Sequence, residues 1–379
     1  MATTTAAAEF PWDGSVLLVN ATTYRLKLGE RAALFCARRQ KLYEMNPSAD
    51  AIWMALAAEG SPAAAARALS DNGGKPAEVV NFVRQAALGW LRGGHLVPAE
   101  VLELLSGNPA AELSLKLDEL CPLLRIHGDV QPDQILSVFG QFRSQAAASR
   151  EISIVGAGGL VFMFEGRQPL GAWDEQRWIP ELKARLTEQY TQAVSGAFLT
   201  HGALLSRGDQ GLLLCGDPGA GKTTLTVALT AAGFQYHADD IVRIDEDGRV
   251  MGVPFSPALK SGAWAILDEI TPDVRALSVY VRSDGQQVKY LPIERASRRP
   301  LPLAAVLLLA RQTEGEARIE ATEPLQVLTA ILGSAYSARG SLDVETLRAL
   351  ADAANAARGG RLSYSNLDDA VRAIGAFMP

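Results

Sequence analysis

Cysteine and histidine are scarce in this sequence, which has 379 residues but only three cysteines and four histidines. The cysteines are Cys36, Cys121 and Cys215, an odd number, and their spacing matches neither a Cys-x-x-Cys pair nor a Cys/His zinc site. These features exclude a disulfide framework and a structural zinc site, and they favour a reducing compartment.

An excess of positive charge is also missing, as are long hydrophobic runs. Lys and Arg total 36 against 42 Asp and Glu, a net charge of -6, so no global basic field attracts nucleic acid or an anionic membrane. No run reaches the roughly 18 apolar residues that span a bilayer. The start, "MATTTAAAEFPWDGS", lacks the basic and apolar segments of a secretory signal. We therefore expect a cytoplasmic protein with neither a nucleic-acid nor a membrane partner.

The chain is too long for one ordinary hydrophobic core and predicts two or three domains. We expect a flexible N-terminus at 1–14, a small domain at 15–98, a connecting region at 99–150 and a nucleotide-binding domain at 151–379, with its core at 197–379. The connecting region could hold either helices or strands. The sequence leaves open whether the chain forms a homo-oligomer.

Residues 15–98 combine short β-prone runs with three helices. The runs are "SVLLVN", "RAALFCA" and "KLYEMN". The first helix is "NPSADAIWMALAAEG", ended by Gly60, and Ser61 is the expected N-cap of the second. The third, "PAEVVNFVRQAALGWLRGGHLVP", is closed by Gly93 and Gly94. This order predicts a winged-helix-like α+β domain.

Two stretches of this domain, "YEMNPSADAIWMALAAEGSPAAAARAL" and "VVNFVRQAALGWLRGGHLV", resemble the PqqD-like family, the precursor-recognition domains of ribosomal peptide maturation. The resemblance implies a binding domain in which a leader peptide adds as an extra strand beside the third strand and packs on the third helix. Candidate leader contacts are Leu42, Tyr43, Val80 and Val83. The alternative is that these residues fill the domain's own core.

The segment "GDPGAGKT" at 216–223 fits the phosphate-loop pattern G-x-x-x-x-G-K-[ST], and it lies between a buried strand, "GLLLC", and a helix, "KTTLTVALTAAG". Backbone N–H groups and the helix N-terminus would hold phosphate oxygens. Lys222 would reach the β- and γ-phosphates, Thr223 would bind Mg²⁺, and Thr224 would add a phosphate contact. The predicted triphosphate-binding residues are Gly216, Asp217, Pro218, Gly219, Ala220, Gly221, Lys222, Thr223 and Thr224.

Two adjacent carboxylates follow the next predicted strand, "FQYHA". A right-handed crossover returns this strand near residues 211–215, so Asp239 and Asp240 should lie at the same sheet edge as the phosphate loop. Adjacent side chains at a strand end point in different directions. One carboxylate can therefore face Mg²⁺ while the other faces an incoming hydroxyl.

His201 opens a predicted hairpin, "FLTHGALLSRGDQGLLLCG", which turns at Gly208 to Gly211. Counting back from the turn places His201 across from Gly216, within about two residues. We therefore expect His201 near the phosphates. The alternative is a strand-end histidine bonded to the backbone.

Together, "LTHGALL…LLLCGDPGAGKTTLTVALTAAGFQYHADDIVRID" resembles the HPr kinase/phosphorylase family, and more closely the HPr kinase-related proteins found beside peptide-maturation modules. The resemblance implies an α/β P-loop kinase core with a mixed sheet, ATP and Mg²⁺ as cofactors, Asp239 as general base, and Asp240 with Thr223 at the metal. It leaves open which Asp has which role.

By the same resemblance Lys222 and His201 belong to the catalytic set, and Lys260 and Lys289 are candidate phosphate or substrate contacts. Lone lysines such as these two are more often surface residues. The long glycine-containing signature of the bifunctional enzymes is missing, which favours kinase activity without phosphorolysis.

The sequence therefore predicts an ATP- and Mg²⁺-dependent kinase that phosphorylates a Ser or Thr hydroxyl of a ribosomally made precursor peptide, preferably lasso-type, recruited through its leader. The peptide substrate rests on resemblance alone. Three alternatives stay open: a nucleotide-switched precursor-binding chaperone that transfers nothing, a carboxykinase-like or small-metabolite phosphotransferase, and a serine kinase acting on an HPr-type phosphocarrier protein.

Overall fold

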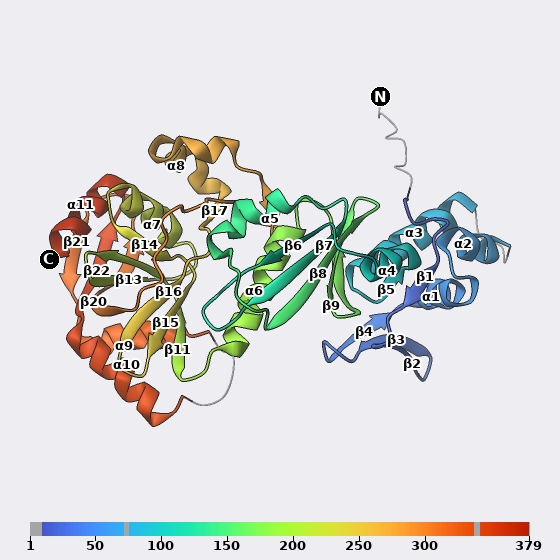
Figure 1. Ribbon diagram of the computed structural model, residues 1–379, viewed down its shortest axis with the longest axis horizontal. Coiled ribbons are helices and arrows are strands. Elements are labelled where there is room, and N and C mark those ends of the chain that lie inside the picture. The colour runs from blue at the N-terminus through green and yellow to red at the C-terminus, as the bar shows by residue number, and fades with distance from the viewer. Residues whose placement is uncertain (1–9, 72–75, 337–341, 379) are drawn as a thin grey trace. The chain divides into compact units, whose positions relative to one another are not determined.

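The computed structural model describes residues 10–71, 76–336 and 342–378. Its chain forms two compact units. The first contains the described parts of 1–115 together with 121–132 and 145–178, and the second contains 116–120, 133–144 and the described parts of 179–379. Figure 1 labels the elements of both units.

In its described residues the first unit contains three sheets and four helices. A sheet of order β2-β3-β4 is antiparallel, β1 pairs with β5, and a five-stranded sheet has the order β10-β9-β8-β7-β6. The elements are β1 (Leu17–Val19), β2 (Thr23–Leu28), β3 (Arg31–Cys36), β4 (Lys41–Met45), α1 (Pro47–Glu59), α2 (Pro62–Ser70), α3 (Pro76–Arg92), β5 (Leu96–Pro98), α4 (Ala99–Ser106), β6 (Ala111–Ser114), β7 (Pro122–Gly128), β8 (Arg150–Ala157), β9 (Leu160–Glu165) and β10 (Gln168–Trp173).

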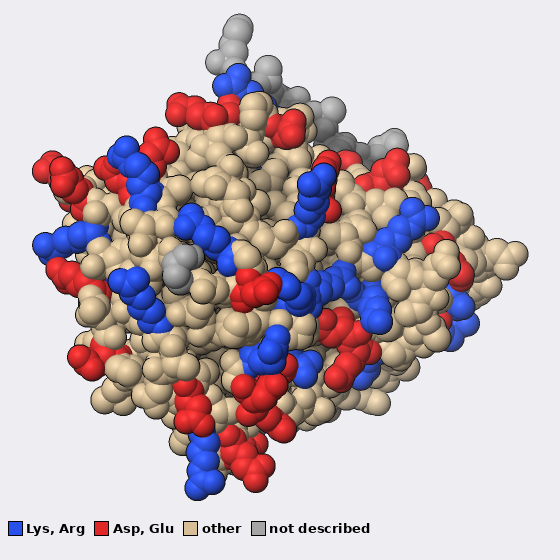
Figure 2. Space-filling view, turned by 60° about the vertical axis from the view of Figure 1, so that its left-hand side comes forward, with Lys and Arg blue, Asp and Glu red and all other residues tan. Residues whose placement is uncertain are grey.

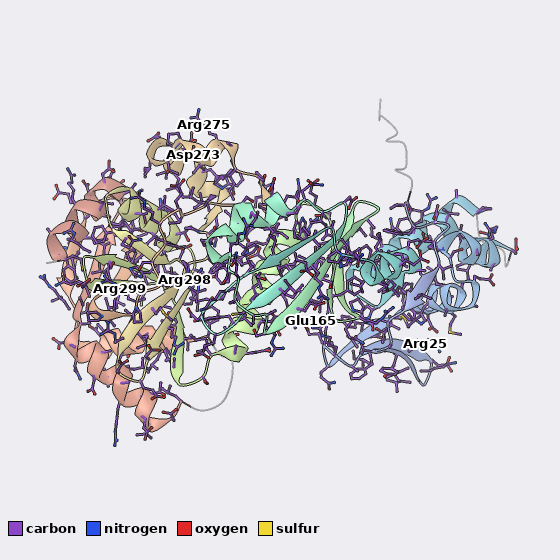
Figure 3. The ribbon with its side chains drawn as sticks, viewed as in Figure 1. Arg25, Glu165, Asp273, Arg275, Arg298 and Arg299 are labelled. Carbon is purple, nitrogen blue, oxygen red and sulfur yellow. The ribbon has the colours of Figure 1, made fainter. Side chains whose placement is uncertain are left out.

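The three predicted helices of this unit are confirmed, and their ends have the expected chemistry. The Asn46 side chain accepts a hydrogen bond from the N–H of Ala49, and the Ser61 hydroxyl caps α2 in the same way. Gly60 ends α1 with φ +79°, a left-handed conformation that favours glycine. Strand β2 was not predicted. Its Arg25, labelled in Figure 3, forms an ion pair of 2.6 Å with Asp50 of α1.

One hydrophobic core joins the N-terminal helices to the five-stranded sheet of the first unit. Buried residues from the helices, such as Trp53 and Leu91, belong to the same cluster as Val155, Phe162 and Phe164 of the five-stranded sheet. The compact units therefore do not divide at residue 151, because strands β8 to β10 pair with β7 and share the core of the N-terminal helices.

The predicted flexible N-terminus lies outside the described residues for 1–9. Among residues 10–14, Trp12 is buried and makes an edge-to-face contact with Phe162, and Asp13 accepts a hydrogen bond of 2.9 Å from Arg84. Residues 10–14 are therefore packed onto the first unit.

The second unit is built around a nine-stranded mixed sheet. Its elements are α5 (Pro132–Phe139), η1 (Gly140–Phe142), α6 (Trp178–Ala193), β11 (Ala197–His201), β12 (Ala203–Arg207), β13 (Gln210–Cys215), α7 (Lys222–Ala231), β14 (Gln235–Ala238), β15 (Ile241–Asp245), β16 (Arg249–Val253), β17 (Ala258–Lys260), η2 (Ser261–Ala263), α8 (Trp264–Ile270), η3 (Pro272–Ala276), β18 (Tyr280–Val281), β19 (Gln287–Tyr290), β20 (Leu301–Arg311), β21 (Arg318–Ala321), α9 (Pro324–Gly333), α10 (Val344–Ala356), β22 (Arg358–Tyr364) and α11 (Leu367–Phe377). The first residues of α5 and α6 are counted with the first unit.

Helices cover both faces of the nine-stranded sheet (Figure 1). Along β13, Leu212 and Leu214 belong to the core formed with α7 and α11, whereas Leu213 and Cys215 belong to the core formed with α9 and α10. This alternation follows from the two-residue period of a strand. Strand β13 pairs in parallel with β20 and antiparallel with β12, so the predicted mixed α/β fold is confirmed.

The region 99–150 is divided between the units. Residues 116–120 and 133–144 join the second unit, where the guanidinium of Arg298 donates 2.7 Å hydrogen bonds to the carbonyls of Lys116 and Gln141 and stacks over Phe142 (Arg298 is labelled in Figure 3). This region is therefore folded structure, with strands β6 and β7 and helices α4 and α5.

The hydrophobicity of the helices and the charge of the surface both bear on possible partners. No helix in them combines the length and the hydrophobicity that crossing a bilayer requires. On the face shown in Figure 2, basic and acidic side chains are mixed, in line with the small net charge.

Candidate active site

The phosphate loop joins the end of β13 to the start of α7, as the sequence pattern predicts. Gly219 and Gly221 have φ values of +92° and +91°, which non-glycine residues rarely adopt. The N–H of Ala220 donates to the carbonyl of Asp217 at 3.0 Å, and the hydroxyl of Tyr364 donates to the carbonyl of Ala220 at 2.9 Å. The loop is therefore a closed turn, braced by the last residue of β22.

Lys222 is the first residue of α7 and is buried. Its ammonium donates a hydrogen bond of 2.6 Å to the carbonyl of Gly216, at the start of the loop. Burial lowers the pKa of Lys222, and the nearby carboxylate of Asp239 opposes that shift. The lysine thus lies over the loop, with an acid beside it.

Asp239 follows β14 and is only 8% exposed. Burial raises its pKa to about 7, although a hydrogen bond from the Thr223 hydroxyl opposes the rise. Within the described residues its Oδ1 atom has no hydrogen-bond partner. A buried carboxylate oxygen without a donor is costly, so this atom is available to a cation or a bound group.

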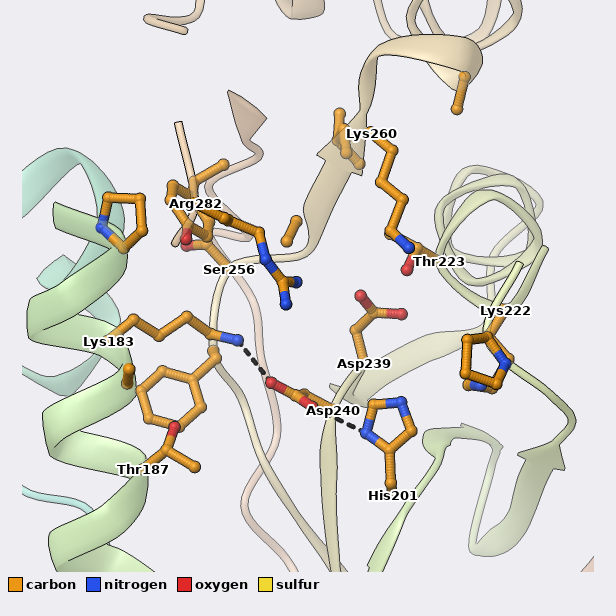
Figure 4. A pocket seen from close by; sticks show the side chains of 18 of the residues that line it. Lys183, Thr187, His201, Lys222, Thr223, Asp239, Asp240, Ser256, Lys260 and Arg282 are labelled. Carbon is orange, nitrogen blue, oxygen red and sulfur yellow. Dashed lines mark hydrogen bonds and ion pairs between the residues drawn. The ribbon is translucent and has the colours of Figure 1, made fainter. Parts of the chain in front are cut away.

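Asp240 lies beside Asp239 and faces a different set of partners. Its Oδ2 accepts a bond of 2.5 Å from the ammonium of Lys183 on α6, and its Oδ1 lies 2.6 Å from the hydroxyl of Tyr336 and 2.9 Å from Nδ1 of His201 (Figure 4). Burial alone would raise the pKa of Asp240, but these partners, Lys183 foremost, hold it well below its ordinary value. Asp240 is therefore a carboxylate held in an ion pair with Lys183.

The predicted hairpin that brings His201 to this edge is confirmed. Strand β12 pairs with β13 in the register Ala203 to Leu214, which extrapolates His201 to Gly216. His201 itself ends β11, pairs with Ile241 and lines the same cavity as the phosphate loop. Its side chain is 44% exposed.

A single cavity of about 790 Å³ is lined by the predicted residues from both the loop and the carboxylate pair. Those that line it are His201, Pro218, Gly219, Gly221, Lys222, Thr223, Thr224, Asp239 and Asp240. As predicted, the two acids point in different directions, Asp239 toward Thr223 and Asp240 toward Lys183 (Figure 4).

Several cavity residues were not predicted from the sequence, namely Lys183, Arg282, Arg311 and Tyr336. The sequence does contain a signal for Lys183. This lysine falls at helical spacing among Ile179, Leu182 and Leu186, which are all fully buried on α6. A lysine in an apolar stripe needs a buried partner. No comparable pattern marks Tyr336.

The two lysines suggested by resemblance have different environments. Lys260 is exposed and lines the cavity, so a phosphate or substrate contact stays a prediction. Lys289 is buried, donates to the carbonyl of Val274 at 2.8 Å and lies over the ring of Trp264. It does not line the cavity and is not a surface residue, because these contacts use its ammonium inside the fold.

Thr223 and Asp239 have the donor atoms that Mg²⁺ needs beside a phosphate loop. Mg²⁺ in such sites takes one or two protein oxygens, substrate phosphates and water. The Thr223 hydroxyl is bonded to Asp239, whose second oxygen is unpartnered, so these two residues fit the ion. Groups of three or more His, Cys, Asp or Glu that could hold a metal do not occur in the described residues.

The predicted leader contacts differ in accessibility. Leu42 on β4 is 55% exposed, and Tyr43 and Val80 are partly buried. Val83 is fully buried in the core of the first unit, so it belongs to the core and offers no contact surface. Phe82, one residue earlier on α3, is exposed and was not predicted.

The fold and the loop define a mixed α/β protein with a phosphate-binding loop between a central strand and a helix. No protein-family model matches the chain, and no curated protein matches it. Among solved structures, the Hpr(Ser) kinase/phosphatase from Coxiella burnetii is similar over 47% of this chain and 95% of its own, with 9% sequence identity and a TM-score of 0.25. At those values the likeness supports no statement about function.

Proposed function

We propose that the chain is an ATP- and Mg²⁺-dependent phosphotransferase that phosphorylates a Ser or Thr hydroxyl of a ribosomally made precursor peptide, with a lasso-type precursor preferred. The observation that carries the reaction type is a single cavity lined by Lys222 of the phosphate loop and by Asp239 and Asp240. Phosphoryl transfer needs little more from a protein than positioning and charge stabilisation, which these groups supply.

The geometry supports a division of roles between the two acids. Asp239 contacts Thr223 and has a free oxygen, so we assign Asp239 and Thr223 to the metal. Asp240 is engaged by Lys183, Tyr336 and His201, so we assign it to positioning and not to the metal role that resemblance suggested. Bound Mg²⁺ would neutralise negative charge on the β- and γ-phosphate oxygens.

The loop residues would act directly on the nucleotide. The N–H of Ala220 is bonded to Asp217, so the other loop N–H groups and the N-terminus of α7 would bind phosphate oxygens, and Lys222 would offset the charge of the transferred group. Such donors are worth most in a cavity with little water, and Lys222 and Asp239 are both buried.

Recruitment of the peptide is assigned to the first unit. Within the described residues β4 pairs only with β3, so its other edge is free to accept an extended peptide as an added strand. Leu42 is exposed on this strand. A leader held there would raise the local concentration of the acceptor hydroxyl, so the cavity itself can bind the acceptor weakly.

The test is to incubate the full chain with ATP, Mg²⁺ and the peptide encoded by a neighbouring open reading frame, and to measure the peptide mass. We expect one or more added phosphate groups. Lys222→Ala and Asp239→Asn should each lower the rate by about 100-fold or more while leaving leader affinity unchanged. Loss of leader affinity in both variants would contradict the assignment of separate sites.

Leu42→Asp tests the leader site with little risk to the fold, because the side chain is exposed. It should weaken peptide binding and slow peptide phosphorylation while leaving nucleotide binding unchanged. A deletion of the first hundred residues is a poor substitute, since it would expose the buried face of β8 and β9. Phosphorylation that does not depend on Leu42, or that uses only a small metabolite, would contradict the peptide assignment.

A further inference from the structure

The contacts of His201 fix its tautomer. The Lys183 ammonium donates to Asp240 Oδ2 at 2.5 Å and the Tyr336 hydroxyl donates to Oδ1 at 2.6 Å, so this carboxylate acts as an acceptor and its 2.9 Å contact with Nδ1 of His201 is a bond that the ring nitrogen donates. In the neutral ring Nε2 is then unprotonated and can accept a proton. No hydrogen bond to Nε2 occurs among the described residues, and Figure 4 shows this nitrogen turned toward the space between Asp239 and Lys222.

The two acids beside the loop are assigned to other roles: Asp239 keeps a free oxygen for the metal, and Asp240 contacts the far nitrogen of the His201 ring. Both oxygens of Asp240 hold partners, and the carboxylate of Asp239 points toward Thr223 and away from the His201 ring (Figure 4). A hydroxyl that attacks a phosphoryl group held on the loop needs an acceptor on the cavity side opposite Thr223. His201 lines the cavity, and its Nε2, which has no hydrogen-bond partner among the described residues, faces this side (Figure 4).

We propose that Nε2 of His201 accepts the proton of the attacking hydroxyl, and that Asp240, held by Lys183 and Tyr336, positions the ring. This inference rests on the proposed phosphoryl transfer. An acid that bonds the far nitrogen of a histidine fixes both its orientation and its tautomer, and it stabilises the imidazolium that forms.

The step balances as follows. The acceptor oxygen forms a bond to the γ-phosphorus as the bond from that phosphorus to the β,γ-bridging oxygen breaks, and its electron pair leaves with the nucleoside diphosphate. The hydroxyl proton moves to Nε2 of His201. The resulting positive ring is balanced by Asp240, and because the side chain is 44% exposed the proton can then pass to water.

Lys183 and Tyr336 are positioning residues in this scheme. Without Lys183, the Asp240 carboxylate would lose its closest cation and could turn away from the ring. Tyr336 contributes one neutral hydrogen bond to the same oxygen that His201 contacts. We therefore expect a larger loss of rate from Lys183→Met than from Tyr336→Phe.

The experiment compares His201→Ala with wild type in two reactions, peptide phosphorylation and slow hydrolysis of ATP by water. Both need a proton acceptor, so the test does not depend on the identity of the peptide. We expect His201→Ala to be slower by about 100-fold or more in both reactions, with unchanged ATP affinity by calorimetry. Added imidazole should restore at least a tenth of the lost rate in His201→Ala and none in Asp239→Asn.

Tyr336→Phe removes one hydrogen bond to Asp240 but keeps the His201–Asp240 pair, so its rate should fall by less than about tenfold, far less than in His201→Ala. Hydrolysis by His201→Ala at a rate within threefold of wild type would overturn the proposal, as would failure of imidazole to restore activity. If no peptide is phosphorylated but hydrolysis needs His201, the peptide substrate is wrong and the proton acceptor is right.

Discussion

Replacement of Lys183 by Met is the most informative test of the site's electrostatics. The ammonium lies 2.5 Å from Asp240, and the two side chains are 13% and 23% exposed. At an effective dielectric constant of about 20 the attraction at this distance is roughly 7 kcal/mol, much of it offset by the cost of burying the ammonium. Removing one partner of a buried pair costs about 3–5 kcal/mol. His201 and Tyr336 still contact Asp240 in this variant. We therefore expect Lys183→Met to lower the free energy of unfolding by about 3 kcal/mol, the low end of that range.

The assay is urea denaturation followed by circular dichroism, at constant pH and salt, of a double-mutant cycle with Lys183→Met, Asp240→Asn and the double variant. The double variant should be destabilised by less than the sum of the single variants, with a coupling of about 2 kcal/mol, because neither charge is then left alone. Lys260→Met, at an exposed position, is the control and should change stability by less than about 0.5 kcal/mol. Additive single effects, or a Lys183→Met variant as stable as the control, would refute the reasoning.

Two further predictions concern a buried histidine and the phosphate loop. Burial lowers the pKa of His237 from its ordinary 6.5 to about 4. Between pH 4 and pH 6.5 this histidine therefore binds a proton in the unfolded chain but not in the folded one. Its contribution to the free energy of unfolding is fully present above pH 6.5 and is lost as the pH falls toward 4. In His237→Gln the free energy of unfolding, measured by urea denaturation at several pH values, should fall by about 3 kcal/mol less over this pH range than in wild type. The same dependence on pH in both proteins would contradict the prediction. In the loop, a Cβ at Gly221 would lie 2.5 Å from the Tyr364 hydroxyl, whereas at Gly219, with nearly the same φ, it would meet no atom within 4 Å. Calorimetry should therefore show ATP bound about tenfold more weakly by Gly221→Ala than by Gly219→Ala, and equal affinities would contradict the predicted clash.

Local patterns in the sequence predict part of this site. The phosphate loop is contiguous, its flanks show a strand and a helix, and the acid pair follows the next strand, so Lys222 and Asp239 could be placed at one edge. His201 could be placed by counting along one hairpin. Lys183 and Tyr336 could not be placed in this way. Lys183 reaches Asp240 from α6 and Tyr336 from the segment after α9, and tertiary packing alone brings these parts together.

The fold shows the same limit. Strands β8 and β9 form a hairpin that turns at Gly158 and Gly159. The residues of the hairpin alone do not predict which hydrophobic core it packs into. Val155 and Phe162 pack with the N-terminal helices, so a boundary drawn at 151 from local patterns separates residues that share one core. The region 99–150 was ambiguous because its apolar runs are too short to separate strand from helix.

The pairing of β13 with β20, and the bond from Tyr364 to the loop, have a consequence for biosynthesis. Strand β13, which carries the loop, pairs with β20, and the loop is bonded by Tyr364 of β22. Both of these partners are translated much later than β13. Closing such distant contacts is slow, so a ribosome-bound nascent chain should not bind nucleotide until β22 has emerged from the exit tunnel.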